Sequence, residues 1–130
     1  MEILDLIIKQ QWFDAILSGE KTKETREIRP TTSGRYVEYY DTRTGEAFPQ
    51  GHEFHEDDEN VGVKPKHYDA IRFYVGYQKD RASALVRVLD AEIFTMKYDD
   101  GEPAIYEYKG KKYVAAQIDY TLGDIIESNV

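Results

Sequence analysis

Hydrophobic residues crowd the start of the chain and then recur at helical spacing. Residues 3–8 are nearly all apolar, a pattern typical of a strand buried on both faces. An apolar stripe at helical spacing follows, made of Trp12, Phe13, Ile16 and Leu17. Gly19 is suited to end this helix, because glycine readily adopts the left-handed conformation of a helix C-cap. The pattern predicts one strand followed by one amphipathic helix.

A second strand is predicted over residues 22–28, and Pro30 ends it because proline cannot donate a hydrogen bond to a neighbouring strand. Residues 31–66 then show little periodicity and include an acidic run at residues 56–59. Ordered loops of this length are uncommon unless they carry function or short elements of their own. We therefore expect a long irregular acidic loop at about 31–66, in part mobile or insertion-like.

Strand-like patterns return in the second half of the chain. Residues 71–75 alternate between apolar and polar positions, and residues 82–97 predict a long, bent strand. Residues 106–113 predict a hairpin with its turn at Lys109-Gly110, whose second arm continues to Tyr120.

Thr121 is expected to cap a short helical turn that buries Leu122, Ile125 and Ile126. With the strands above, this predicts an α+β, mainly β fold: a small mixed β-barrel of about five or six strands, with one N-terminal helix and short extra helical turns. A length of 130 residues suits a single domain over residues 1–130.

Composition narrows the classes of function. The formal net charge of −8 disfavours coating of long DNA or RNA, because the surface repels phosphates, but a local basic pocket can still bind a nucleotide. The absence of cysteine excludes disulfides, thiolate metal sites and a cysteine nucleophile. The N-terminus is too acidic and too short for a signal peptide, and no apolar run approaches the ~20 residues of a membrane span. We expect a soluble, cytoplasmic protein without a membrane partner.

The segment after the first helix carries the candidate chemistry. It places Lys21 at a turn, and Glu24 and Arg26 two residues apart on one side of an extended chain. A cation, a carboxylate and a planar guanidinium that converge in this way can hold a polar, partly anionic group. The alternative is a set of surface ion pairs, which contribute little stability and need no function.

With these elements in order, the chain resembles the ASCH family of small, PUA-like β-barrels associated with RNA. The resemblance rests on Gly19-x-Lys21-x-x-Glu24-x-Arg26 after the amphipathic helix, and on Tyr120-x-Leu122-Gly123-Asp124-Ile125 near the end. It covers most of the chain except the loop at 31–66. It implies a cleft beside the barrel in which the motif residues face a ligand derived from nucleic acid.

The resemblance also implies a possible activity. Some ASCH proteins are amidohydrolases that remove acetyl from 4-acetylcytidine with the motif lysine, a threonine three residues later and a distant glutamate. Lys21 fills the lysine position, but Glu24 stands where the threonine is expected, so a hydroxyl-assisted route is lost. The candidates for the distant glutamate are Glu92, Glu102 and Glu107. A carboxylate at position 24 can instead serve as a general base on water.

Two further patterns favour plain structural roles. The stretch His52-Glu53-Phe54-His55-Glu56 falls one residue short of the zinc-protease spacing, so we expect a solvated acidic loop, no metal and no cofactor. Tyrosines can stack on nucleobases, but packing is their default role in a small barrel. Those considered are Tyr36, Tyr39, Tyr40, Tyr74 and Tyr77.

Three hypotheses follow. The first is a module that binds RNA or a nucleotide in an electropositive cleft, where Lys21 contacts phosphate and Arg26 offers its fork to a base edge or phosphate. Glu24 then accepts a hydrogen bond from an exocyclic amine or a ribose hydroxyl, and Arg29 and Arg35 extend the basic lip.

The second hypothesis is a small hydrolase of a modified nucleoside, in which Glu24 positions water and Lys21 stabilises developing negative charge. The third is a protein-interaction domain whose acidic loop at 41–59 mimics nucleic acid or docks on a basic partner. The sequence leaves the oligomeric state open.

Overall fold

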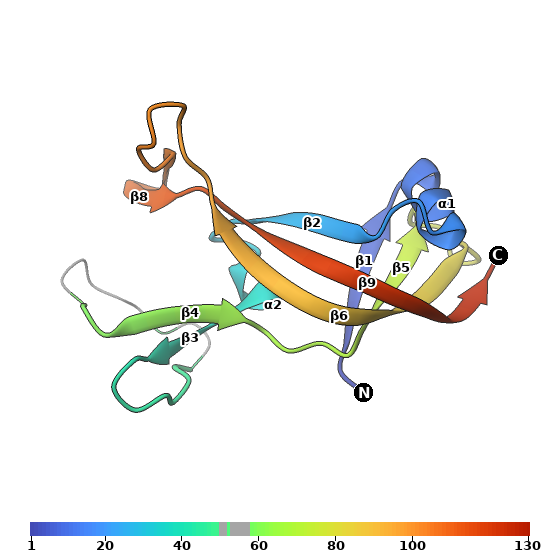
Figure 1. Ribbon diagram of the computed structural model, residues 1–130, viewed down its shortest axis with the longest axis horizontal. Coiled ribbons are helices and arrows are strands. Elements are labelled where there is room, and N and C mark those ends of the chain that lie inside the picture. The colour runs from blue at the N-terminus through green and yellow to red at the C-terminus, as the bar shows by residue number, and fades with distance from the viewer. Residues whose placement is uncertain (50–51, 53–57) are drawn as a thin grey trace. The chain divides into compact units, whose positions relative to one another are not determined.

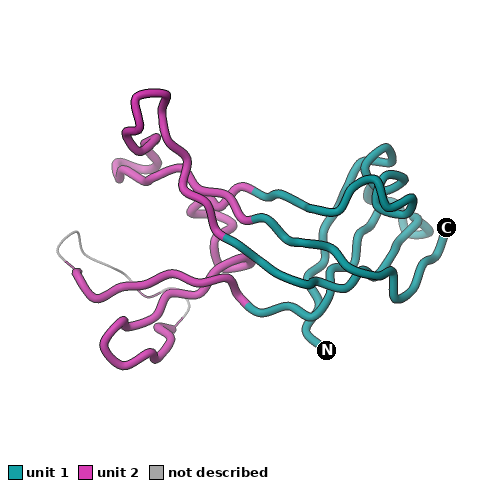
Figure 2. Tube along the Cα trace, viewed as in Figure 1, with its two compact units in different colours: residues 1–26, 67–92, 119–130 teal, residues 27–66, 93–118 magenta. Residues whose placement is uncertain are grey.

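The computed structural model describes residues 1–49, 52 and 58–130. Its chain divides into two compact units (Figure 2): residues 1–26, 67–92 and 119–130 form unit 1, and residues 27–66 and 93–118 form unit 2. In chain order the elements are β1 (Ile3–Ile8), α1 (Gln10–Ser18), β2 (Lys23–Ile28), α2 (Ser33–Tyr36), β3 (Val37–Asp41), β4 (Val61–Pro65), β5 (Ala70–Val75), β6 (Ser83–Thr95), β7 (Ile105–Tyr108), β8 (Lys111–Val114) and β9 (Ala116–Asn129), as Figure 1 shows.

A five-stranded sheet is the largest element of the fold. Its strand order is β1-β5-β6-β9-β2, with β1 and β5 parallel and β5 and β6 antiparallel. The α+β, mainly β class is confirmed, but the described strands form no closed barrel. The prediction of about five or six strands was too low, because the described residues form nine strands: five in this sheet and four in two small two-stranded sheets, β3-β4 and β7-β8. The prediction of a single domain stays a prediction.

The core of unit 1 lies on one face of this sheet. Leu4, Leu6 and Ile8 of β1 are buried, whereas Asp5 between them is exposed. The prediction that β1 is buried on both faces was therefore wrong. As an edge strand it needs only one apolar face, and Ile3 is among the exposed hydrophobic residues.

The first helix forms as predicted, but fewer of its apolar residues are buried than the predicted stripe contained. Gly19 caps α1 with a φ of 85°, and its N–H donates to the carbonyl of Ile16. Phe13 and Ile16 are buried, whereas Trp12 keeps 48% of its surface exposed. Assigning Trp12 to the core stripe was wrong, because a nine-residue helix on a sheet buries only the side chains that face the sheet.

The prediction of a helical turn at Thr121 was wrong. Residues 116–129 form one strand, β9, in which Ile118, Tyr120 and Leu122 are buried at a spacing of two. The apolar residues that follow suited a helix locally, but pairing within the sheet prevailed. An added Cβ at Gly123 would meet the Leu89 side chain at 2.9 Å, so the Leu-Gly motif lets that side chain lie close to the β9 backbone.

The region predicted as an irregular loop holds three elements, α2, β3 and β4. The β3 and β4 strands pair so that Tyr40 lies opposite Gly62, where the Tyr40 ring occupies the space of a missing side chain. The sequence pattern did not reveal β4, because Gly62 interrupts the alternation of apolar and polar residues along this strand. The predicted hairpin is confirmed at its turn: β7 and β8 join through Lys109 and Gly110, both with positive φ. Its second arm was predicted to continue to Tyr120, but β8 ends at Val114 and a separate strand, β9, begins at Ala116.

Candidate functional site

The segment that carries the candidate site is fixed at both ends. The N–H of Lys21 donates to the carbonyl of Ala15 at 3.0 Å, which holds the turn after α1 against the helix. In the strand that follows, the Thr25 hydroxyl donates to the Asp119 carboxylate on β9 at 2.7 Å. Alternation along β2 then sends Glu24 to the opposite, buried side, and Arg26 to the same side as Glu24.

Glu24 is the centre of the cluster. Only 7% of its surface is exposed, and no other charged residue in the described part of the chain is buried. One carboxylate oxygen, Oε1, lies 3.4 Å from the Arg26 Nε, and the other, Oε2, lies 4.0 Å from the Lys21 Nζ. The Oε2 atom has no hydrogen-bond donor among the described residues. Buried carboxylate oxygens are normally hydrogen-bonded, so this atom is a candidate ligand contact.

The electrostatics of Glu24 reflect a competition. Burial raises the pKa of Glu24 above its usual value of 4.5, because desolvation disfavours the charged form. The charges of Arg26 and Lys21 and a hydrogen bond from Arg26 lower the same pKa, but by less. The result is a carboxyl group that is easier to protonate than a surface glutamate.

The two cations are placed by different contacts. Arg26 donates through Nη2 to the carbonyl of Ile7 on β1 at 2.9 Å, so its guanidinium is held between the carboxylate and that strand. The Lys21 ammonium lies 5.7 Å from the centre of the Trp12 ring, within cation–π range. Sequence reasoning missed both neighbours. Nothing in the sequence indicates the contact with the Ile7 carbonyl, whereas Trp12 stands out as a large apolar residue in the first turn of the helix.

The other predicted site residues take part in contacts of their own. Arg29 and Arg35 belong to unit 2, where Arg29 pairs with Glu27 and Arg35 lies against the Tyr36 ring. The basic lip formed by these two arginines stays a prediction. The three candidates for a distant catalytic glutamate are exposed, and a catalytic role for any of them stays a prediction: Glu92, Glu102 and Glu107.

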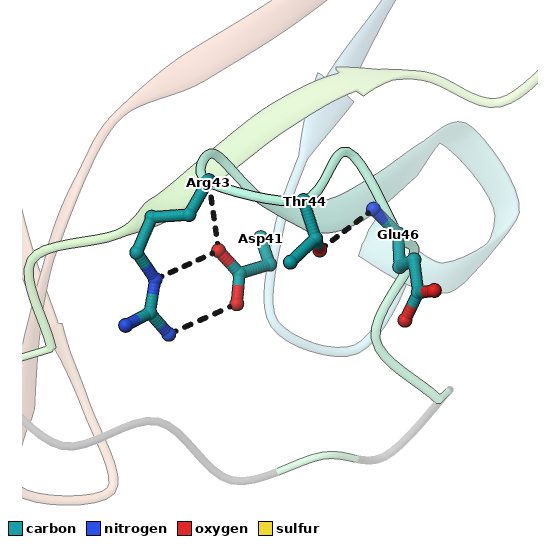
Figure 3. A network of polar contacts seen from close by, with 4 residues as sticks. All are labelled: Asp41, Arg43, Thr44 and Glu46. Atoms are coloured by element: carbon teal, nitrogen blue, oxygen red, sulfur yellow. Dashed lines mark hydrogen bonds and ion pairs between the residues drawn. The ribbon is translucent and has the colours of Figure 1, made fainter.

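A separate cavity of about 330 Å³ lies in unit 2 and is lined in part by Asp41, Arg43, Phe48 and His52. Two of its charged groups pair with each other: Arg43 donates three hydrogen bonds to the Asp41 carboxylate, two from its guanidinium and one from its backbone N–H (Figure 3). These bonds lower the pKa of Asp41. The lining also includes Asp58 and Glu59, so acidic side chains outnumber the one arginine around this cavity.

The remaining sequence motifs contribute no further site. Of the histidine-glutamate stretch, only His52 is described, and its ring stacks on Phe48. Residues 53–57 lie outside the described part, and within that part no three acidic or histidine side chains are grouped to hold a metal ion. Tyr36 is buried in the core, while Tyr74 contacts the Arg81 guanidinium at 4.0 Å. No described helix has the length and apolar character needed to cross a membrane.

Comparison with known proteins leaves the site to be interpreted from its geometry. No family model, no curated protein and no solved structure matches this chain.

Proposed function

We propose that the chain is a cytoplasmic, ASCH-like module that binds RNA or a nucleotide at the cluster of Lys21, Glu24 and Arg26. The observation that supports this best is the Oε2 atom of Glu24, which is enclosed and lacks a donor among the described residues. Burial of a carboxylate without full hydrogen bonding costs stability. A ligand that donates to this atom compensates that cost.

The two cations give the site a local charge opposite to that of the whole protein. Lys21 and Arg26 outnumber Glu24, whereas the chain carries a formal net charge of −8. Such a small basic site suits a single phosphate or a short strand and does not suit a long duplex. In this proposal Lys21 binds the phosphate, Arg26 fixes the orientation of Glu24, and Glu24 accepts a hydrogen bond from the ligand.

A hydrolase of acylated nucleosides is the second candidate, and the raised pKa of Glu24 favours it. A carboxylate with a raised pKa is a better general base toward water than a surface glutamate. Lys21 then stabilises the oxyanion that forms on the substrate carbonyl. This candidate requires turnover of 4-acetylcytidine that Glu24→Gln abolishes, and no product at high protein concentration would contradict it.

Thermal unfolding with added nucleotides tests the binding proposal. A nucleotide present at a hundred times its dissociation constant should stabilise the protein by about 2.7 kcal/mol, which raises the melting temperature by roughly 10 °C. Lys21→Ala should remove most of this shift. The matched control is Lys23→Ala, which deletes the same charge from an exposed position at the start of β2, two residues further along the chain, and should keep the shift. Equal responses of the two variants would contradict the proposed site.

A further inference from the structure

The exposed Trp12 lies beside the proposed site and has no role in the core. Nearly half of its surface is exposed, although tryptophan is the largest apolar side chain and α1 buries Phe13 next to it. Among the residues that the structure describes, the Lys21 ammonium is the only charged group in contact with the face of the Trp12 ring. An aromatic face that is open to solvent beside a cation offers a stacking surface for a planar ligand.

The Lys21 ammonium connects this ring to the buried carboxylate. Its Nζ lies 5.7 Å from the ring centre and 4.0 Å from the Oε2 of Glu24. A single small donor group therefore reaches both features. Lys21 is a flexible side chain that is a quarter exposed, so its ammonium can leave this position when a ligand offers a replacement.

From this arrangement we infer that Trp12 and Glu24 together read a nucleobase that carries an exocyclic amino group. The base stacks on the Trp12 ring, and its amino group donates to the Oε2 of Glu24 in the place that the Lys21 ammonium occupies. The displaced ammonium then binds the phosphate of the same nucleotide. This inference rests on the proposed function and specifies its ligand as a nucleotide of cytosine, adenine or guanine, the bases that carry such a group.

The chemistry of the acceptor sets the selectivity. An ionised carboxylate only accepts hydrogen bonds, so it pairs with the amino group of cytosine, adenine or guanine. Uracil and hypoxanthine present a carbonyl oxygen in place of the amino group of cytosine and adenine, which leaves both acceptors unpaired and facing each other. A site that is built to bind a donor rejects the analogue that lacks it.

Fluorescence titration tests the inference, because Trp12 is the only tryptophan of the chain. At pH 8, where Glu24 is more fully ionised, CMP and AMP should quench the emission, with dissociation constants at least tenfold lower than those of UMP and IMP. Glu24→Gln should abolish this preference, since an amide both donates and accepts. By calorimetry, Trp12→Leu should weaken CMP and UMP alike, by about tenfold to a hundredfold, and leave their ratio unchanged.

Cytidine without phosphate supplies a second test of the displacement. Lys21→Ala should weaken CMP, but it should not weaken cytidine, because the competing ammonium is gone. Equal affinity for CMP and UMP would overturn the inference while the proposed function survives. The same holds if CMP binds without changing the emission of the wild-type protein and binds Trp12→Leu as tightly as the wild type. If no nucleotide changes either the emission or the melting temperature, the proposed function fails together with the inference.

Discussion

Replacing Arg26 with alanine is expected to lower the free energy of unfolding by about 3 kcal/mol at neutral pH. Removing one partner of a buried ion pair costs about 3–5 kcal/mol, because the other charge is left buried without compensation. The lower end applies here, since the Arg26 side chain is 27% exposed and Lys21 remains near the carboxylate. The variant also loses the hydrogen bond to the carbonyl of Ile7. Urea unfolding of both proteins measures the difference.

The loss caused by Arg26→Ala should depend on pH. Burial raises the pKa of Glu24, so the folded protein binds this proton more tightly than the unfolded chain. The contribution of Glu24 to stability therefore falls as the pH rises from about 4.5 through its folded pKa. In the variant this penalty is larger, because Arg26 no longer opposes it. The difference between the two proteins should be largest at pH 8 and should shrink toward pH 4, where Glu24 is protonated.

Two companion variants isolate the cause. Adding Glu24→Gln to Arg26→Ala should recover most of the lost stability, because no buried charge remains to be paired. Arg29→Ala is the matched control: Arg29 also pairs with a glutamate on β2, but both side chains are exposed. That control should change stability by no more than about 0.5 kcal/mol. A loss in Arg29→Ala as large as that in Arg26→Ala would contradict the assignment of Glu24 as a buried charge.

Replacing Phe73 with alanine should destabilise the protein by about 4 kcal/mol, the largest effect that we expect from one substitution. Phe73 lies on β5, between Leu6 of β1 and Ala84 of β6 in the strand register. All three residues are essentially inaccessible to solvent, and the small Ala84 leaves room for the phenyl ring. Truncation creates a cavity in the row that joins three strands. Urea or thermal unfolding measures the loss.

Phe94→Ala is the control for Phe73→Ala, since it deletes the same ring from a β6 position that is 39% exposed. Its cost should stay near 1 kcal/mol. Similar losses in the two variants would mean that the row of Leu6, Phe73 and Ala84 is not the centre of the core.

The strands with clear alternation and the helix with a glycine stop were predictable from the sequence, because their patterns are local. Residues 71–75 and the hairpin at Lys109-Gly110 are examples. The pairing of Tyr40 with Gly62 was not predictable, since a ring on one strand fills the space of a glycine on another. The helical turn predicted after Thr121 failed for a related reason. The spacing of apolar residues there suits a helix locally, but pairing with neighbouring strands makes the segment part of the sheet.

The residues of the candidate site were predictable from the sequence, but their burial and their neighbours were not. The spacing of two residues places Glu24 and Arg26 on one side of a strand, and both lie there. Spacing carries no information on burial, so the enclosure of Glu24 and the raised pKa that follows were not foreseen. Trp12 lies next to the site because the turn after α1 brings Lys21 back over the helix. The sequence gives no indication of this contact, because the two residues are nine positions apart.

An NMR titration of the ¹⁵N-labelled protein with CMP tests most directly whether the ligand binds at this cluster. We expect progressive shifts of the backbone amides of residues 21–26 and of the Trp12 indole N–H, with weaker changes elsewhere. Shifts confined to other positions, such as the surroundings of Asp41 and Arg43, would contradict the account. An unchanged spectrum at millimolar CMP would contradict it as well.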